Sequence, residues 1–249
     1  MFDKETLLSV EKKLKLENKE FVEKAYLHEL ILSELAKSNL FFVFKGGTAL
    51  YKFYNLPRFS EDLDFCVKDL DLVSKKLKAI LDKHNFKFTA KRIYNTNLFR
   101  ISFKGPLVRD NTLRIDLSTS PTYVFEQKIL NPKFADFTPF IINVMSLKEI
   151  LAEKISALMQ REKARDLYDF QFLSRATEFD SELWKTKFDK TEIVLDAVEL
   201  HAKAFKTDWK KLNTYVLTDL PDFDLIYPLV LEKLNNFNEQ LKEKKEKNK

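Results

Sequence analysis

Glycine and cysteine are the residue types that this sequence most conspicuously lacks. It has three glycines in 249 residues, and two of them, Gly46 and Gly47, are adjacent. Glycine tolerates positive φ and a close approach of the backbone to another group. The pair therefore predicts a tight turn whose backbone packs closely against another part of the protein or a ligand. The single cysteine, Cys66, excludes an internal disulfide framework and any multi-cysteine zinc site. It fits a reducing cytoplasm.

Long apolar runs are also missing. No uninterrupted apolar stretch approaches the ~18 residues needed to span a bilayer. The first residues, Met-Phe-Asp-Lys-Glu, lack the apolar segment of a signal peptide. We therefore expect a soluble, cytoplasmic protein with no membrane partner. The net charge of +5 permits an anionic partner without requiring one.

The spacing of apolar residues changes along the chain. It is helical over residues 5–38 and again over 48–54 and 69–84, and Asp69 or Asp71 is suited to cap the last of these helices. The remaining segments before residue 145 are β-like runs bounded by turn residues. They span 41–44, 63–67, 86–94, 98–104, 112–118 and 140–144.

Beyond residue 145 only helical patterns remain. Ser146 is suited to cap the first helix, and breaks fall near 177–180, 207–208 and Pro221. We predict an α+β protein: a mixed-sheet domain over residues 1–145, with N-terminal helices and an antiparallel meander over 86–118, followed by a helical bundle over 146–249.

Carboxylates fall at regular positions on the predicted strands. On a strand, alternate residues share a face, so Asp62 and Asp64 point the same way. Their mutual repulsion is relieved by a cation, and a divalent metal is the obvious one. Asp116 adds a third carboxylate from another strand, where Arg114, Asp116 and Ser118 alternate with apolar residues.

The glycine pair precedes a predicted helix, whose first N–H groups lack partners within the helix. These groups suit the phosphates of a nucleoside triphosphate (NTP). Asp62 and Asp64 would hold Mg²⁺ (or Mn²⁺) against the phosphates, and Asp116 would share a second ion and accept a proton from the attacking hydroxyl. Together the residues predict two-metal phosphoryl or nucleotidyl transfer.

Three motifs occur in order along the chain. The first comprises Gly46-Gly47-Thr48-Ala49-Leu50 and Arg58-Phe59-Ser60-Glu61-Asp62-Leu63-Asp64, the second is Asp116, and the third comprises Lys154, Arg161 and Arg165-Asp166-Leu167-Tyr168-Asp169. Over residues 40–173 they resemble the nucleotidyltransferase superfamily with the DNA polymerase β core. Within it they look most like the AbiEii-type toxins of type IV toxin-antitoxin and abortive-infection systems, including the MenT-like enzymes.

The resemblance implies roles for these residues. Asp62, Asp64 and Asp116 would bind metal and, with Lys154, carry catalysis. The residues implied in nucleotide binding are Gly46, Gly47, Thr48, Arg58, Ser60, Lys154, Arg161 and Asp166. The resemblance further implies an RNA acceptor, in particular a tRNA 3′ end, and a toxin restrained by a separate antitoxin.

Several of these residues also suit purely structural roles. Thr48 is suited to cap the helix after the glycines, and Arg58 and Ser60 to shape the loop before the strand. At 100° per residue, Lys154 falls within the apolar arc of its helix and Arg161 at its edge. A buried cation needs a partner, so ion pairing with Asp or Glu is the alternative to phosphate binding. Asp166 and Asp169 either orient these cations or lie on the surface.

The motifs are also compatible with other functions. The acceptor is alternatively a small molecule or a protein side chain, and a nucleotide-binding module without turnover would carry the same motifs. A basic cleft in the helical half would favour RNA. Its candidate side chains are Lys185, Lys187, Lys203, Lys206, Lys210 and Lys211.

Overall fold

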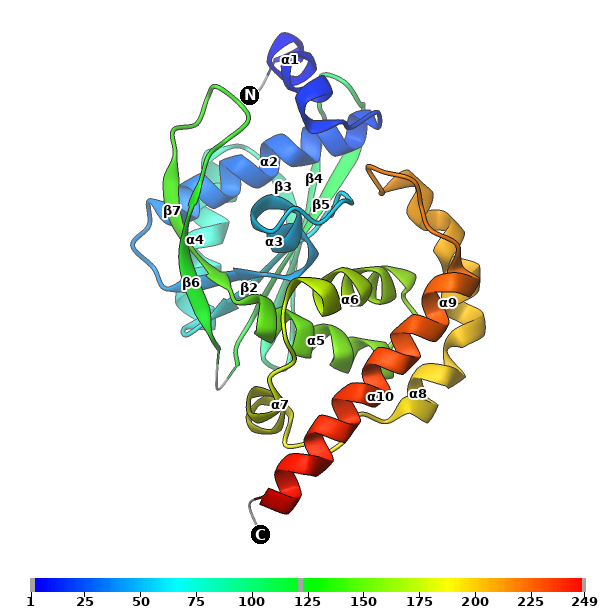
Figure 1. Ribbon diagram of the computed structural model, residues 1–249. Coiled ribbons are helices and arrows are strands. Elements are labelled where there is room, and N and C mark those ends of the chain that lie inside the picture. The colour runs from blue at the N-terminus through cyan, green and yellow to red at the C-terminus, as the bar shows by residue number, and fades with distance from the viewer. Residues whose placement is uncertain (1–2, 121–122, 248–249) are drawn as a thin grey trace. The chain divides into compact units, whose positions relative to one another are not determined.

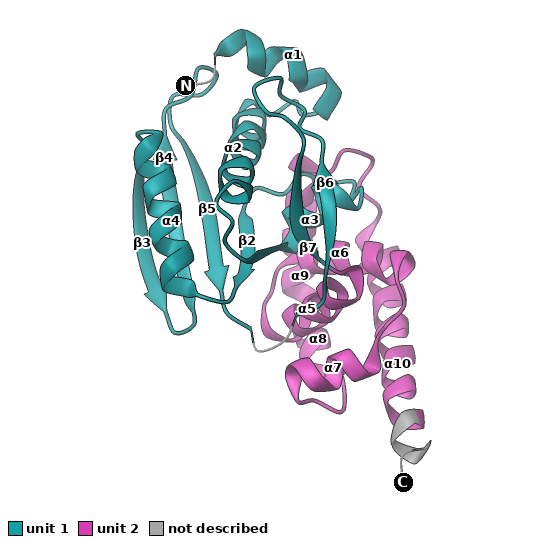
Figure 2. Ribbon diagram, turned by 90° about the vertical axis from the view of Figure 1, so that its left-hand side faces the viewer, with its two compact units in different colours: residues 1–145 teal, residues 146–249 magenta. Residues whose placement is uncertain are grey.

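The structure is a computed structural model that describes residues 3–120 and 123–247. The chain forms two compact units, residues 1–145 and 146–249 (Figure 2).

Unit 1 is built on one seven-stranded sheet (Figure 1). Its helices are α1 (Lys4–Leu14), α2 (Lys19–Ala36), α3 (Gly46–Phe53) and α4 (Leu70–Lys83). Its strands are β1 (Phe42–Lys45), β2 (Leu63–Val67), β3 (Lys87–Ile93), β4 (Thr96–Phe103), β5 (Asn111–Ser118), β6 (Phe125–Leu130) and β7 (Phe140–Met145). The spatial order of the strands is β3-β4-β5-β2-β1-β7-β6.

The sheet is mixed, and its middle is the part that brings the motifs together. β2 lies between β1, which is antiparallel to it, and β5, which is parallel to it. β3, β4 and β5 form the antiparallel meander expected from the sequence. Helices α2 and α4 pack together over one face of the sheet, as Figure 2 shows. The predicted α+β class with a mixed sheet is confirmed.

Two details of unit 1 differ from expectation. β6 was not predicted, because its residues are mostly exposed and do not alternate between apolar and polar. It lies at the edge of the sheet and pairs with β7. Helix α3 begins at Gly46, two residues before the helical pattern at 48 that the sequence indicated.

Helix α2 contributes buried charge to the packing of unit 1. The Glu23 carboxylate accepts hydrogen bonds from the backbone N–H groups of Leu107 and Val108 and from Asn111 Nδ2. Glu29 pairs with Lys52 of α3 at 3.3 Å and accepts from the Lys133 N–H. These buried carboxylates therefore tie α3 and two loops to a central helix.

Unit 2 is helical throughout its described residues. It contains α5 (Leu147–Gln160), α6 (Ala164–Ala176), α7 (Ser181–Phe188), α8 (Leu195–Leu200), α9 (Ala202–Trp209), the 3₁₀ helix η1 (Lys210–Thr214) and α10 (Phe223–Lys247). Ser146 caps α5 as expected, and Asp69 likewise caps α4. The expected break at 207–208 is wrong, because α9 runs through it. No helix among the described residues is long and apolar enough to cross a membrane.

Candidate active site

The turn between β1 and α3 is the first element of the site. Gly46 has φ +75°, and a Cβ on it would overlap the Asp64 carboxylate. Both the backbone conformation and the space therefore require glycine. The helix has no side-chain N-cap, so its first N–H groups lack a capping side chain.

Gly47 lets the loop before β2 approach the start of α3. A Cβ on Gly47 would come within 2.7 Å of both Arg58 Nη2 and Ser60 Oγ. Thr48 lies inside the helix, and its hydroxyl donates a hydrogen bond to the carbonyl of Asp62. The expectation that Thr48 caps α3 is therefore wrong, and its hydroxyl instead ties the helix to the loop that carries Asp62.

The three predicted carboxylates come from neighbouring positions on the sheet. Asp64 on β2 and Asp116 on β5 are register partners, so they stand side by side on one face. Asp62 immediately precedes β2. All three side chains are partly exposed, which leaves them accessible to a ligand.

Arg114 is a site residue that the sequence interpretation did not single out. Its Nη2 lies 2.9 Å from Asp116 Oδ2 and 3.7 Å from Asp62 Oδ2. The guanidinium thus supplies positive charge between two carboxylates. The signal was present in the sequence, because Arg114 is two residues before Asp116 on a strand and must share its face.

The carboxylate oxygens of the site supply some of the ligands that a divalent metal ion needs. Oδ1 of Asp116 is buried and has no hydrogen-bond partner, an arrangement that suits a cation ligand. No group of three His, Cys, Asp or Glu side chains in the described part of the chain is arranged to hold a metal ion by itself. Mg²⁺ keeps several waters and shares phosphate oxygens, so these carboxylates suit an ion that arrives with its nucleotide.

The environment of Asp116 changes its ionisation. Burial raises the pKa of Asp116 to about 6, the charge of Asp64 adds to the rise, and Arg114 opposes it. A carboxyl group with a pKa in this range is better suited to accept a proton near neutral pH than an ordinary aspartate.

The metal-free protein should lose stability between about pH 4 and pH 6 because of Asp116. Over this interval the unfolded chain has released the proton that the folded state still holds, so the free energy of unfolding falls as pH rises. Urea titrations at several pH values, in EDTA, test this. Asp116→Asn should lack this decrease, and equal pH profiles for the two proteins would contradict the prediction.

Gly46→Ala should impair both stability and turnover. The positive φ costs an alanine about 1–2 kcal/mol, and the added Cβ displaces Asp64. We expect transfer to fall by at least about 100-fold, since misplacement by 1 Å has that effect on catalysis. The comparison is Gly105→Ala, whose Cβ would instead meet the Glu23 carboxylate; it should lower stability while the folded fraction keeps its turnover.

Glu61 holds the loop that carries Asp62. Its carboxylate pairs with the buried Lys24, and its carbonyl oxygen lies 2.7 Å from Nε2 of His28. Burial lowers the pKa of His28 to about 3, so the ring is neutral. His28, whose position in the sequence carries no motif, therefore supports this loop.

Unit 2 contains a compact cluster of opposite charges at the third motif. Lys154 Nζ of α5 lies 2.8 Å from Asp166 Oδ1 and 2.7 Å from Asp169 Oδ2, and both carboxylates belong to α6. Arg161 also binds Asp166, through Nε at 2.7 Å and Nη2 at 2.9 Å. The ion pairing considered for Lys154 is therefore present.

The structure decides between the two alternatives for Asp166 and Asp169. Both are fully buried against the cations, so the surface alternative is excluded. The expected place of Arg161 is corrected. α5 ends at Gln160, and Arg161 follows it in an extended conformation, so Arg161 is not on the helix face. Burial alone would raise the pKa of Asp166, but Lys154 and Arg161 outweigh burial and hold that pKa below its usual range.

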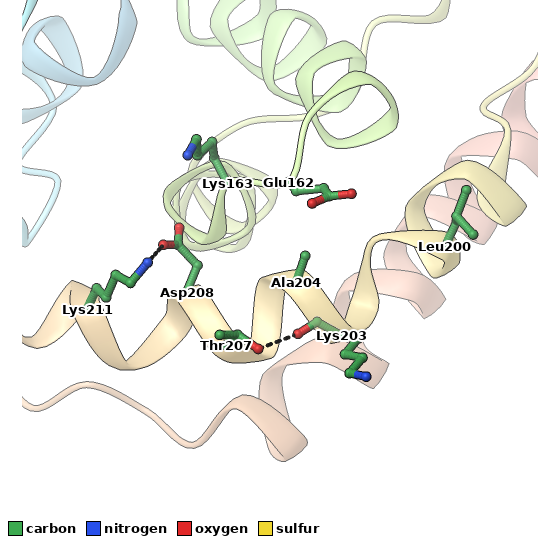
Figure 3. A pocket seen from close by; sticks show the side chains of 8 residues that line it. All are labelled: Glu162, Lys163, Leu200, Lys203, Ala204, Thr207, Asp208 and Lys211. Atoms are coloured by element: carbon green, nitrogen blue, oxygen red, sulfur yellow. Dashed lines mark hydrogen bonds and ion pairs between the residues drawn. The ribbon is translucent and has the colours of Figure 1, made fainter.

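The lysines proposed for a basic cleft in unit 2 are mostly ion-paired. Lys187 is buried between Glu149 and Glu153, and Lys206 pairs with Asp224. A hollow of about 480 Å³ is lined by Lys163, Lys203 and Lys211 together with Glu162 and Asp208. Figure 3 shows these side chains. The mixed charges of the hollow do not form the basic cleft that would favour RNA in this half of the chain.

Comparison with protein families identifies the chain. Residues 30–243 match the family described as "Nucleotidyl transferase AbiEii toxin, Type IV TA system". The chain belongs to this AbiEii family. It is therefore a nucleotidyltransferase toxin by family, and the resemblance drawn from its three motifs is confirmed.

Solved structures with the same fold include two relatives of this AbiEii protein. The nucleotidyltransferase toxin MenT4 of Mycobacterium tuberculosis is 18% identical, with a TM-score of 0.67 over 95% of this chain and 92% of that one. JHP933 of Helicobacter pylori is 21% identical, with a TM-score of 0.61 over 92% of this chain and 97% of that one. At these identities the likeness shows the fold. Among curated proteins, none matches the sequence significantly.

Proposed function

We propose that this AbiEii protein transfers a nucleoside monophosphate from an NTP to a hydroxyl of RNA, in particular at a tRNA 3′ end, and releases pyrophosphate. The observation that best supports nucleotidyl transfer is the grouping of Gly46, Asp64 and Asp116 at the start of α3. The RNA acceptor is inferred from the family resemblance and from the exposed basic residues Lys87, Lys91 and Arg100 of unit 1.

The chain's own residues would act as follows. The first N–H groups of α3 bind the triphosphate, with Arg58 and Ser60 shaping the loop beside them. The acceptor oxygen attacks the α-phosphorus as the bond to the β-phosphate bridge breaks, and Asp116 accepts the hydroxyl proton. Asp62, Asp64 and Asp116 are the residues that would hold Mg²⁺ or Mn²⁺. When bound, such ions neutralise charge on the phosphate oxygens.

In unit 2, we assign phosphate contact to Arg161 and Lys154. Arg161 keeps 47% of its side chain exposed while Asp166 fixes two of its nitrogens. A guanidinium held in this way is pre-oriented for an oxyanion. Lys154 is more buried, and Asp166 and Asp169 position it.

The biological context is also inferred. A type IV toxin is opposed by an antitoxin, and we propose that one acts against this protein. The single cysteine is buried and free, which suits the reducing cytoplasm.

The test is incubation of the purified protein with Mg²⁺, each labelled NTP in turn and total RNA. Label should enter RNA and be lost when Asp64 is changed to Asn. Transfer to a small molecule or to protein, with none to RNA, would replace RNA as the acceptor. Absence of transfer to any acceptor, with metal binding intact, would overturn the enzymatic proposal.

A further inference from the structure

The sheet face that carries Asp64 and Asp116 continues beyond the site across β5, β4 and β3. On β5 this face is made by Thr112, Arg114, Asp116 and Ser118, since alternate residues share a face. The register places Arg100 of β4 opposite Arg114, and Leu98 opposite Asp116. On β3, Thr89 is opposite Arg100, and Lys91 is opposite Leu98.

The other side of these three strands is already covered. Phe99, Ile101 and Phe103 of β4 are buried there, and Asn97 Nδ2 donates a hydrogen bond to Ser74 Oγ of α4 at 2.7 Å. The side with the catalytic carboxylates is different, because Lys87, Thr89, Lys91, Arg100, Ser102 and Thr112 are all exposed on it. We call these six residues the outer sheet face.

The outer sheet face is basic and uncompensated. Lys87, Lys91 and Arg100 form no ion pair within the described residues. Asp116 is the only acid on this side of the three strands. On the opposite side, by contrast, Arg92 is neutralised by Asp71 at 2.7 Å.

Two basic residues of the outer sheet face, Lys91 and Arg100, lie close to Asp116. Neighbouring strands are ~4.8 Å apart and alternate residues ~7 Å apart. Arg100 and Lys91 are therefore within about two strand spacings of Asp116. A polyanion lying on them would end beside the carboxylates.

We propose that the outer sheet face binds the sugar-phosphate backbone of the acceptor RNA, an inference that rests on the proposed nucleotidyl transfer to RNA. Lysine, arginine and hydroxyl side chains are the groups that contact phosphate and ribose oxygens. The alternate positions on β3, β4 and β5 that make this side include no aromatic residue. The face therefore lacks a platform for base stacking, and its contacts are independent of sequence.

The experiment compares two triple variants of the full chain. Lys87→Gln/Lys91→Gln/Arg100→Gln removes three positive charges from the outer sheet face. Lys75→Gln/Lys76→Gln/Lys78→Gln removes the same charge from exposed positions on α4, which covers the other side of the sheet. A charge-conserving variant, Lys87→Arg/Lys91→Arg/Arg100→Lys, tests whether substitution alone damages the protein. Thermal unfolding checks that all three are folded.

Binding of fluorescently labelled total tRNA is measured at ~50–200 mM salt, the range over which phosphate contacts weaken strongly. The outer-face variant should bind at least about tenfold more weakly at the lowest salt. Its log–log salt slope should be smaller by about 2, since each lost contact to a single strand removes ~0.7. The α4 variant and the charge-conserving variant should resemble the wild type. Equal weakening in the two triple-Gln variants, or no tRNA binding by the wild type, would overturn the proposal.

Labelled-NTP transfer by the same preparations separates this proposal from the proposed function. RNA binding through the outer sheet face without any transfer would support the surface and contradict the enzymatic reaction. Transfer to RNA with the same KM for RNA in both triple-Gln variants would support the reaction and overturn the surface. The KM for NTP should be unchanged in the outer-face variant.

Discussion

Asp64→Asn should reduce nucleotidyl transfer by about 1,000-fold or more. The substitution keeps the shape of the side chain but removes a negative charge beside Gly46 and next to Asp116. Metal ions supply several kcal/mol of transition-state stabilisation, and each 1.36 kcal/mol is about tenfold in rate. Loss of one ligand should therefore be seen in kcat more than in the KM for NTP. Steady-state kinetics with labelled NTP measure both.

The control for this variant is Asp71→Asn. Asp71 is an exposed aspartate in the first turn of α4, where it pairs with Arg92. Its variant should keep wild-type turnover, and both variants should unfold at nearly the wild-type temperature. An Asp64→Asn protein with more than about a tenth of wild-type kcat would contradict the assignment of Asp64 as a metal ligand, given the magnitude expected.

Lys154→Met should have the largest effect on stability. It removes the ammonium group that lies within 2.8 Å of two fully buried carboxylates. Breaking a buried ion pair by removing one partner costs about 3–5 kcal/mol, because the remaining buried charge loses compensation. Arg161 would still bind Asp166. Much of the total stability of a domain, about 5–15 kcal/mol, would be lost. Denaturant unfolding followed by circular dichroism measures the change.

Two further variants separate stability from chemistry at this position. Lys154→Met/Asp169→Asn removes one carboxylate with the cation, and it should recover part of the lost stability because less uncompensated charge stays buried. Lys154→Arg keeps the charge, so it should retain most of the stability. If Lys154 also contacts phosphate, Lys154→Arg should still raise the KM for NTP. A Lys154→Met protein as stable as the wild type would show that the cluster does not hold α5 to α6.

The parts of the fold that the sequence predicted well have strong local patterns. In β5, Leu113, Ile115 and Leu117 alternate with polar residues, which fixed both the strand and the face of Asp116. Asp69 and Ser146 are N-caps, and the side chain of each accepts a hydrogen bond from the backbone N–H three residues later. The Gly46-Gly47 turn was found because glycine is so rare elsewhere.

The parts that were missed depend on contacts distant in the sequence. β6 forms because β7 offers it an edge, and its own residues carry little β pattern. Support of the Asp62 loop by His28 joins positions 33 residues apart. Arg161 followed the helical pattern of α5, yet the backbone leaves the helix there, and its side chain binds Asp166 five residues later. Local periodicity contains no information of this kind.

The guanidinium of Arg114 has a further consequence for the charge balance of the metal-free site. A site with three carboxylates and no compensating charge would strain the folded chain, whereas here an internal cation lies close to two of them. A metal ion that bound at this site would compete with this tethered cation. Because this cation is part of the chain, two of the carboxylates keep a neutralising charge beside them when no metal ion is bound.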